Sequence, residues 1–216
     1  MALVDHWPLF GLRVRTPRIE VRSPDDELGC RLGELATKGI HDPAVMPFGF
    51  PWTDAPIEEL PRNSLQHFWL NRAQLSPASW HLSLVVLVDG EVVGGGGLIA
   101  EQFAQRRTFE TGSWITRSLQ GQGLGYEFRH ACLHLGFAGL GAEMATTGAW
   151  HDNAASLAVT RKLPYEPNGE DVLLRREQPD RLLKFRMPRA AWEAVRRDDI
   201  TIEGLEPCLP LLVGGA

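Results

Sequence analysis

Cysteine is scarce in this sequence. The chain of 216 residues holds only Cys30, Cys132 and Cys208, which are widely spaced and follow no pattern. An odd, unpatterned set argues against a disulfide framework and against a zinc site. Cys132 falls inside a predicted helix, where a small buried residue is more common than a nucleophile. We therefore expect no metal in this protein.

The sequence also lacks runs of positive charge and long apolar segments. Lysine and arginine number 22 against 27 acidic residues, which gives a net charge of −5, and no basic cluster stands out. Proteins that grip nucleic acid usually need such a cluster to neutralise phosphates. No apolar run is as long as a membrane span, and the N-terminus lacks the basic and apolar regions of a signal peptide. These absences predict a cytoplasmic protein that binds neither nucleic acid nor a membrane.

The remaining composition is that of an ordinary globular protein, with 44% hydrophobic and 23% charged residues. Alternating and helical hydrophobic patterns follow one another along the chain. The predicted strands are 12–22, 81–88, 91–100, 108–116, 141–150, 171–177 and 181–188. The first predicted helix starts at 23–25 and continues through Leu35. The other predicted helices are 58–75, 123–138, 152–163 and 189–197, and an irregular tail follows the last of them.

This order of elements predicts one mixed α/β domain, of the α+β kind, around a single sheet. Strands and helices do not alternate regularly, so a doubly wound sheet fits poorly. One domain would fill residues 1–216, with a core at about 16–187, an N-terminal arm at 1–15 and a C-terminal helix and tail at 188–216.

Four consecutive glycines, Gly94–Gly97, stand in the return strand of a predicted hairpin whose turn is Asp89-Gly90. Glycine weakens a strand because it loses much conformational freedom on folding. The run therefore predicts either a bulge or a place where another group approaches the backbone closely.

A glycine-rich turn joins the predicted strand at 108–116 to the predicted helix at 123–138. Gly121, Gly123 and Gly125 stand at alternate positions in it. A helix N-terminus offers unpaired N–H groups and about half a positive charge, and glycines let phosphate oxygens come close. The turn is therefore predicted to hold a pyrophosphate.

Three known phosphate turns compete for this pattern. A P-loop needs a Lys-Ser/Thr pair after its last glycine, and Tyr126-Glu127 stands there instead. The dinucleotide turn needs G-x-G-x-x-G at the start of a βαβ unit, whereas this turn is G-x-G-x-G and follows several strands. The third pattern, Gln/Arg-x-x-Gly-x-Gly/Ala, is satisfied by Gln120, Gly123 and Gly125.

With its surroundings, this third pattern resembles the GCN5-related N-acetyltransferases (GNAT) of the RimJ/RimL type. The stretch "ETGSWITRSLQGQGLG" (110–125) is similar to the E-x-G-x-W-x strand and turn of that type. "DNAASLAVTRKLPY" (152–165) is similar to the family's later helix that begins with asparagine, although Pro164 stands where glycine is usual. The resemblance covers about 16–187. "HWPLF" and "MPFGFPW" also resemble an actinobacterial branch described as succinyl-CoA transferases.

The resemblance implies the GNAT fold, a single mixed, mostly antiparallel, twisted sheet flanked by helices. Acetyl-CoA or succinyl-CoA would lie in a splay between two central strands. Backbone groups at 114–116 and the Asn153 side chain would meet the pantetheine arm, and the N–H groups of 122–127 would meet the pyrophosphate. Asn153 also fits as the N-cap of a helix. The implied coenzyme-binding residues are Trp114, Ile115, Thr116, Gln120, Gly121, Gln122, Gly123, Leu124, Gly125, Tyr126, Glu127, Asn153 and Ser156.

The implied reaction is direct attack of a primary amine on the thioester. Glu110 is the candidate general base, directly or through a water molecule, or else an exposed charge on the sheet. Ser156 lies one helical turn after Asn153, where the serine of RimL-type enzymes is proposed to protonate the leaving thiolate. Tyr165 stands where other branches of the family have an alternative acid, and a core role is favoured for it here.

Phe48, Phe50 and Trp52 fall between the first two predicted helices, which flank the acceptor site in this family. They would either line the acceptor channel or pack under a long connection. The acceptor itself stays open among a protein N-terminus, a lysine side chain, a polyamine and an antibiotic amine. A succinyl group would add a carboxylate suited to an arginine, and the sequence does not single out which arginine that is.

Two other functions fit part of the pattern. One is a module that binds acyl-CoA as a sensor without transferring the acyl group. The other is a nucleotide-dependent oxidoreductase, which the order of elements disfavours. The aromatic N-terminal arm and the tail could also join two copies in a homo-oligomer. His130 and His134 have the spacing of metal ligands on a helix, but Ala131 stands where a zincin has glutamate and no third ligand is evident.

Overall fold

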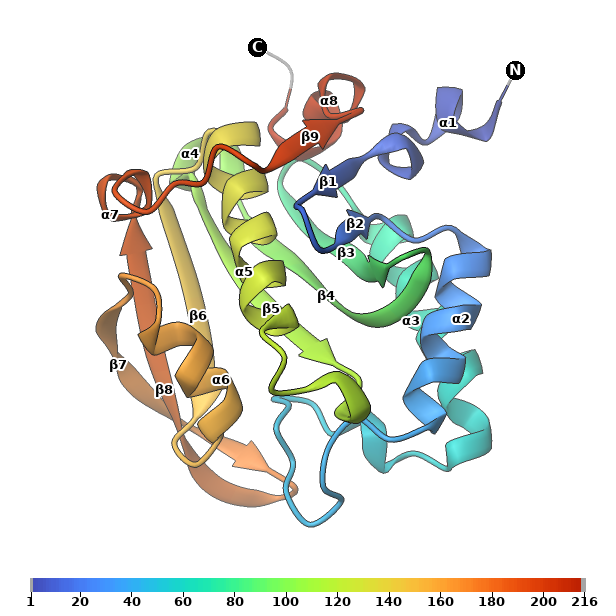
Figure 1. Ribbon diagram of the computed structural model, residues 1–216, viewed down its shortest axis with the longest axis vertical. Coiled ribbons are helices and arrows are strands. Elements are labelled where there is room, and N and C mark those ends of the chain that lie inside the picture. Colours follow the sequence, from blue (N-terminus) through green and yellow to red (C-terminus); the bar gives the residue numbers. More distant parts are fainter. Residues whose placement is uncertain (1, 215–216) are drawn as a thin grey trace.

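The computed structural model describes residues 2–214, and within this range nine strands form one sheet in the order β7-β8-β6-β5-β4-β3-β2-β1-β9 (Figure 1). The strands are β1 (Arg13–Arg15), β2 (Glu20–Arg22), β3 (Ser79–Val88), β4 (Glu91–Glu101), β5 (Thr108–Ile115), β6 (Met144–Trp150), β7 (Glu166–Arg175), β8 (Gln178–Pro188) and β9 (Thr201–Glu203). β5 and β6 are parallel, and the other neighbours are antiparallel. The predicted single, mostly antiparallel sheet is confirmed.

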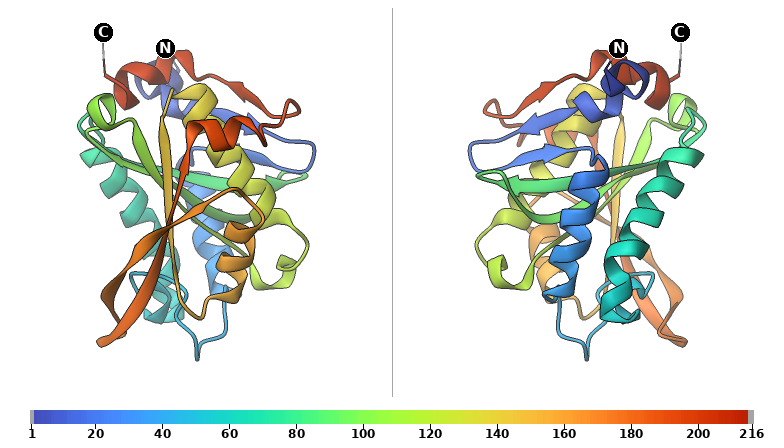
Figure 2. Two further views of the ribbon diagram at one scale, coloured as in Figure 1. Left: turned by 90° about the vertical axis from the view of Figure 1, so that its left-hand side faces the viewer. Right: turned by 90° about the vertical axis from the view of Figure 1, so that its right-hand side faces the viewer.

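Helices cover both faces of this sheet. In Figures 1 and 2, α2 and α3 lie on one face, and α5 and α6 lie on the other. The α-helices are α1 (Leu3–His6), α2 (Asp26–Thr37), α3 (Leu60–Gln74), α4 (Phe103–Arg106), α5 (Leu124–His134), α6 (Ala154–Arg161), α7 (Arg189–Glu193) and α8 (Leu209–Leu212). Shorter turns are the 3-10 segments Pro8–Gly11, Trp52–Asp54, Ile57–Glu59, Arg117–Leu119 and Glu206–Cys208, and the π-helical segment Leu135–Gly139.

Strand β3 explains why both faces of the sheet carry helices. Leu82, Leu84 and Val86 belong to the large core that contains much of α5, whereas Val85 and Leu87 pack with residues of α2 and α3. The second half of β3, residues 84–88, is a continuous hydrophobic run, which is typical of a strand that is buried on both faces. Full burial of each such side chain contributes about 1.5–3 kcal/mol to folding. The two layers of helices thus hold the sheet, and the site at its centre, in one fixed arrangement.

The glycine run is predicted to give a bulge or a close approach, and β4 has both, with the bulge one residue before the run. The register with β3 shifts so that Val86 faces Gly94 and Leu87 faces Val92, which leaves a bulge at Val93. A side-chain carbon on Gly96 would also lie 2.1 Å from the Gly112 carbonyl oxygen of β5, far closer than contact allows. The approaching group is therefore the neighbouring strand itself.

The prediction of one strand at 12–22 is wrong, because this stretch forms the two strands β1 and β2. β1 and β2 form a hairpin, and the Thr16 N–H donates to the Ile19 carbonyl at 3.0 Å across the turn. The Thr16 hydroxyl also accepts from the N–H groups of Arg18 and Ile19. Pro17 has no N–H for a strand ladder, and the threonine side chain offers the backbone a turn instead.

The C-terminal region also differs from its prediction. The helix expected at 189–197 ends at Glu193, and the following segment is not irregular, since β9 pairs with β1 at the edge of the sheet. The Trp80 indole N–H donates to the Leu212 carbonyl at 2.7 Å in the buried core. Figure 1 shows α1 and α8 on the same side of the molecule. These pairings join residues far apart in sequence, which local patterns do not reveal.

Candidate active site

The two parallel strands separate after a short paired stretch. β5 and β6 pair only over 108–110 and 144–146. Both strands then continue without pairing to each other, while β6 keeps its pairing with β8 along its whole length. We call this unpaired stretch, residues 111–115 of β5 and 147–150 of β6, the splay. It provides the arrangement that the family resemblance implies for the coenzyme.

Hydroxyl groups mark the closed end of the splay. Thr147 Oγ1 donates to the Thr111 carbonyl at 3.0 Å, and Thr111 Oγ1 donates to the Thr146 carbonyl at 3.4 Å. Thr111 and Thr147 are both 3% exposed. These side chains extend the contact between the strands by one residue, and beyond them the backbone edge of β5 has no strand partner on this side.

The backbone groups of β5 alternate between its two neighbours. The Thr116 N–H donates to Val93 of β4 at 2.9 Å, so the groups of Thr116 and Trp114 are directed to β4. The groups of Ile115 and Ser113 are therefore directed to the splay. Among the predicted residues Trp114, Ile115 and Thr116, only Ile115 offers its N–H there. Ser113 was not predicted, and strand alternation is the signal that would have found it.

The glycine turn presents a row of unbonded donors at the mouth of the splay. Gly121 and Gly123 have φ values of +76° and +83°, which glycine adopts without strain, and Gly123 is the N-cap of α5. Within the described residues, the backbone N–H groups of 121–126 donate no hydrogen bond. Gln120 fixes the turn, since its Nε2 donates to the carbonyls of Ile40 and Ile115, each at 2.8 Å. Such a row of N–H groups suits a pyrophosphate.

Two charged side chains flank this turn. Arg18 reaches over from the β1–β2 hairpin, and its Nη2 donates to the Gln122 carbonyl at 2.9 Å. The sequence does not reveal this contact, because the two residues are 104 positions apart. Glu127 turns its carboxylate away from solvent to Arg197, with N–O distances of 2.8 and 3.0 Å. Burial raises the pKa of Glu127, but bonds from Arg197 and Thr16 outweigh this effect and leave that pKa below its ordinary value.

Asn153 and Ser156 lie on the inward face of α6. Asn153 Oδ1 accepts from the Ser156 N–H at 3.1 Å, so Asn153 caps the helix. Asn153 Nδ2 also donates to the Pro47 carbonyl at 3.4 Å. Ser156 is half-buried and shares its face with the buried residues Leu157 and Thr160. Its hydroxyl thus lies on the side of the sheet that α5 and α6 cover.

Glu110 lies on the opposite side of the sheet. It is the last residue of β5 that pairs with β6, and its side chain alternates with that of Thr111, which faces α5. Glu110 is exposed to solvent on one side. Desolvation by the surrounding protein raises the pKa of the Glu110 carboxyl above the ordinary 4.5. The positive charges of Lys184 and Arg129 offset part of that rise. A raised pKa suits a general base, since its conjugate acid is then weaker.

Aromatic rings share the face of Glu110. The ring centroids of Phe48 and Trp52 are 5.3 Å apart, and those of Trp52 and Trp114 are 5.9 Å apart. All three rings are half-buried. Phe50 is 75% exposed and does not join them. The predicted group therefore divides into two rings beside the splay and one that faces solvent.

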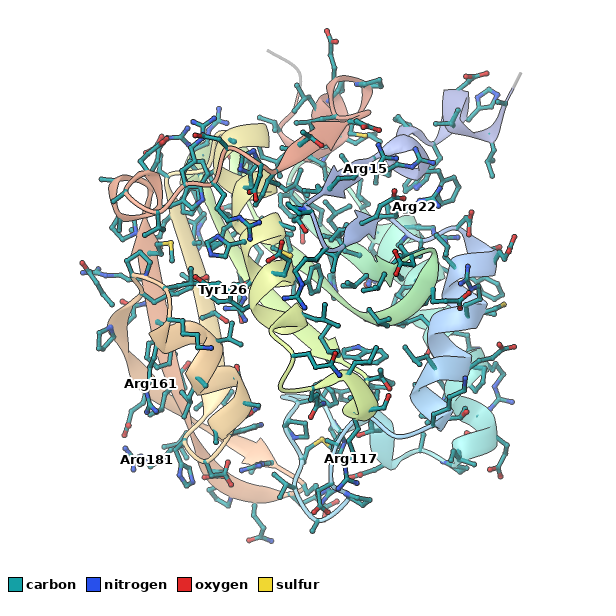
Figure 3. All side chains as sticks on the ribbon, in the orientation of Figure 1. Arg15, Arg22, Arg117, Tyr126, Arg161 and Arg181 are labelled. Carbon is teal, nitrogen blue, oxygen red and sulfur yellow. The ribbon has the colours of Figure 1, made fainter. Side chains whose placement is uncertain are left out.

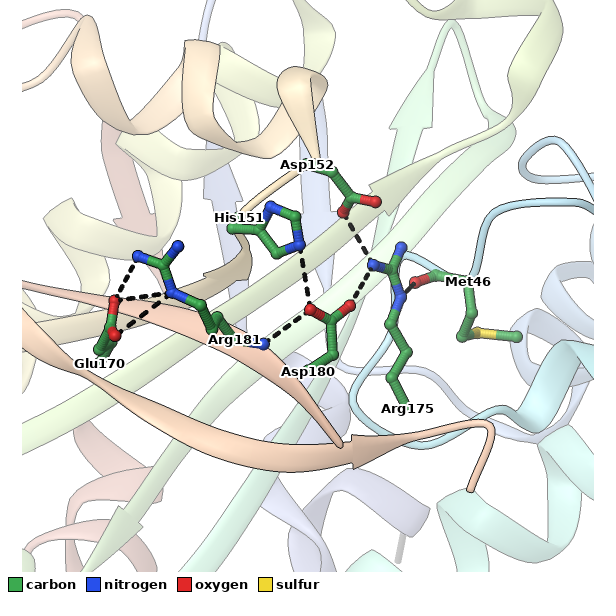
Figure 4. A network of polar contacts seen from close by, with 7 residues as sticks. All are labelled: Met46, His151, Asp152, Glu170, Arg175, Asp180 and Arg181. Carbon is green, nitrogen blue, oxygen red and sulfur yellow. Dashed lines mark hydrogen bonds and ion pairs between the residues drawn. The ribbon is translucent and has the colours of Figure 1, made fainter. Parts of the chain in front are cut away.

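A polar network fastens the segment 41–56 beside the splay (Figure 4). Arg175, from the end of β7, donates from Nε to the Met46 carbonyl at 2.7 Å. Its Nη1 lies 2.8 Å from Asp152 Oδ1 and 2.9 Å from Asp180 Oδ2. One guanidinium thus joins the segment to the β7–β8 hairpin and to the turn between β6 and α6.

Further bonds hold the same segment at both edges of the splay. The Arg176 guanidinium binds both oxygens of Asp54, at 2.7 and 2.6 Å. The Trp150 indole N–H at the end of β6 donates to the Phe48 carbonyl at 3.1 Å. The segment 41–56 consequently crosses from the β5 side, where Gln120 binds the preceding Ile40 carbonyl, to the β6 side.

The two helix histidines pack with aromatic rings. His130 lies 4.7 Å from Tyr126, and His134 lies 5.9 Å from Trp192, between ring centroids. Burial lowers the pKa of both imidazoles.

Across residues 2–214, no three His, Cys, Asp or Glu side chains gather as metal ligands. Over the same residues, no helix combines the length and the apolar character needed to cross a membrane.

A splayed parallel pair, with free N–H groups at the start of the following helix, defines the class of protein. It is the arrangement of an acyl-CoA-dependent transferase of the GNAT fold. The chain matches the acetyltransferase (GNAT) domain over residues 18–166. It therefore belongs to the GNAT acetyltransferase family, and the family resemblance is confirmed.

Solved structures share this fold at low sequence identity. A protein described as a GNAT-family acetyltransferase of Chromobacterium violaceum is 18% identical with a TM-score of 0.67, over 83% of this chain and 92% of that one. RimL, a ribosomal L7/L12 alpha-N-protein acetyltransferase in complex with coenzyme A, is 18% identical with a TM-score of 0.62, over 80% and 95%. The ribosomal-protein-S5-alanine acetyltransferase of Vibrio fischeri is 13% identical with a TM-score of 0.63, over 83% and 98%.

Proposed function

We propose that this protein transfers an acetyl or succinyl group from acyl-CoA to a primary amine by direct attack on the thioester. The observation that carries the proposal is the splay between β5 and β6, with unbonded N–H groups of the glycine turn at its mouth. A coenzyme can then place its phosphates at a helix N-terminus and its thioester between the strands.

The coenzyme is proposed to bind along β5. Its pyrophosphate would accept from the N–H groups of 121–126, with the charge of Arg18 nearby. Its pantetheine arm would add to the open edge of β5, through the backbone groups of Ser113 and the N–H of Ile115, whose carbonyl is bound by Gln120. Asn153 could donate to the arm from the other side by giving up its long bond to Pro47.

Glu110 and Ser156 suit the two proton transfers because they lie on opposite sides of the sheet. The amine nitrogen would attack the thioester carbon from the side of Glu110, which takes the amine proton directly or through water. The carbon–sulfur bond would then break, and Ser156 would give its proton to the departing thiolate. One such proton transfer is typically worth 10²- to 10⁴-fold in rate.

The acceptor would enter over Trp52, Trp114 and Phe48. An α-amine has a pKa of about 8, against about 10.4 for lysine, so its neutral form is far easier to present near neutral pH. Glu110 is the one carboxylate that we place at the reacting atoms, which favours an α-amine, such as a protein N-terminus, over a lysine or another small amine.

The test is a comparison of thermal shifts with CoA, acetyl-CoA, succinyl-CoA and NAD. A ligand that binds only the folded protein raises its Tm. We expect the CoA compounds to raise Tm and NAD to leave it unchanged. A shift with NAD alone would overturn the proposal, and binding of acyl-CoA without thiol release in the presence of amines would point to a sensor instead.

A further inference from the structure

Arg129 is a buried cation that forms no ion pair among the described residues, and the charge of Glu110 acts on it only across the sheet. It lies on α5 and is 3% exposed. Its Nη1 donates to Thr147 Oγ1 at 3.1 Å, its Nε is buried without a partner, and no carboxylate lies within ion-pair distance among the residues described. Burying an ionised group without a counter-charge is costly. A group at this position therefore calls for an anion that the folded chain itself does not supply.

The position of Arg129 is the closed end of the splay. Its hydrogen-bond partner, Thr147 Oγ1, is the hydroxyl that donates to the Thr111 carbonyl at 3.0 Å, at the last contact between β5 and β6. The phosphates of a coenzyme would lie at the other end, over the glycine turn. The thioester and the acyl chain would consequently point toward Arg129.

A second unsatisfied group lies beside this guanidinium. The Arg129 Cζ atom is 5.9 Å from the centre of the Tyr165 ring, and the buried Tyr165 hydroxyl has no hydrogen-bond partner in the part of the chain that the structure describes. A carboxylate has two oxygens and accepts several hydrogen bonds, so it could use both the guanidinium and a phenol. One carboxylate could therefore accept hydrogen bonds from both Arg129 Nε and the Tyr165 hydroxyl.

Several other arginines are paired with acidic side chains, and Arg175 beside the splay is one of them. Arg15 and Arg22 on the β1–β2 hairpin are 2.9 and 3.4 Å from Glu20. Arg181 on β8 is 2.7 Å from Glu170. In Figure 3, Arg15 and Arg22 lie together over the β1–β2 hairpin, and Arg181 lies near the lower left edge of the molecule. Arg129 differs from them in being buried and unpaired.

We propose that Arg129 is the residue that selects the acyl group, by binding a carboxylate at the far end of a dicarboxylic acyl chain, with Tyr165 as a second donor. This inference rests on the proposed function and deepens it, because it favours the succinyl over the acetyl group. The guanidinium fork matches a carboxylate with two parallel bonds, which an uncharged acyl chain of the same length cannot form.

The experiment measures the Kd of succinyl-CoA and butyryl-CoA by calorimetry, for the wild type, Arg129→Met and Arg129→Lys. The two ligands have the same chain length, and butyryl has a methyl in place of the carboxylate. We expect the Kd of the wild type to be about 10- to 150-fold lower for succinyl-CoA than for butyryl-CoA. This ratio corresponds to the net free energy of a hydrogen bond to a charged group. Arg129→Met should lose this preference and still bind acetyl-CoA within about twofold. Arg62→Met, at an exposed position of α3, is the control and should keep the preference.

The outcomes separate this inference from the function on which it rests. If acetyl-CoA binds the wild type but succinyl-CoA is not preferred over butyryl-CoA, the inference fails and the proposed function stands. If neither CoA nor acetyl-CoA binds, both fail. A preference that survives in Arg129→Met also overturns the inference. Should that variant not fold, Arg129→Lys keeps the charge without the fork and is expected to retain only a small part of the preference.

Discussion

The raised pKa of Glu110 should affect stability as well as rate, and the effect on stability is reduced because the residue is exposed to solvent. Its raised pKa means that the folded protein holds the carboxyl proton more tightly than the unfolded chain does. Stability is therefore lost as pH rises from the ordinary pKa through the raised one, and the full cost is present above both. The proposed catalytic role adds a second expectation, because only the ionised carboxylate accepts a proton.

Replacing Glu110 with glutamine should accordingly slow turnover and stabilise the fold at neutral pH. We expect kcat to fall by about 10²- to 10⁴-fold, as for loss of a general base. The gain in Tm over the wild type should be larger at about pH 7 than at about pH 4, where the wild-type carboxyl is protonated too. Equal activity of the two proteins would assign Glu110 to the sheet surface and not to the reaction.

Ser156 offers a prediction of a different kind, since its backbone N–H donates to Asn153 and its hydroxyl forms no hydrogen bond within residues 2–214. Ser156→Ala should leave the helix cap intact and reduce kcat by about 10²-fold, at the low end for a proton donor, because a thiolate leaves readily. The melting temperature should stay close to that of the wild type. A variant with full activity would remove Ser156 from the mechanism.

At the scale of elements, two glycine substitutions can distinguish a loss of phosphate binding at the glycine turn from the general effect of backbone strain. Gly123 has φ of +83°, and a side-chain carbon there would lie 3.2 Å from Arg18 Nη1. Gly169, in β7, has φ of +85° with nothing within 4 Å, so it is a matched control. Both glycine-to-alanine variants should lose about 1–2 kcal/mol of stability. Only Gly123→Ala should weaken CoA binding, and equal weakening by both variants would contradict a phosphate site at this turn.

The segment 41–56 depends on the β7–β8 hairpin for its position. Arg175 donates to the Met46 carbonyl and also binds Asp152 and Asp180, so Arg175→Met removes several links at once. We expect faster amide exchange in this segment and a higher KM for the amine, with the Kd of CoA little changed. An Arg181→Met variant, which loses only an exposed pair with Glu170, should behave as the wild type. Unchanged exchange in Arg175→Met would show that the segment holds itself in place.

The elements also show how far the sequence could predict this site. The glycine turn, the capping Asn153 and the strand before the turn depend on local spacing, and each is found as predicted. The pairing of β9 with β1, the contact of Arg18 with Gln122 and the burial of Arg129 join distant parts of the chain. Hydrophobic periodicity carries no information about such partners, so a sequence places Arg129 on a helix without showing that its charge is unpaired.

At the scale of the whole molecule, the sheet would separate the two proposed substrates. The coenzyme is proposed to lie on the side of α5 and α6, and the amine on the side of Glu110, Trp52 and Trp114. The reaction would occur where β5 and β6 part, because that is where the two sides of the sheet communicate. This arrangement ties the fold to its chemistry, since a continuous sheet would keep the thioester from the amine.

The most direct measurement is the release of CoA thiol from acetyl-CoA and succinyl-CoA in the presence of peptides with a free or a blocked N-terminus. We predict release that requires the free amine, yields the acylated peptide in equal amount, and falls strongly in Glu110→Gln. A protein that binds acyl-CoA yet releases no thiol with any amine would contradict the account.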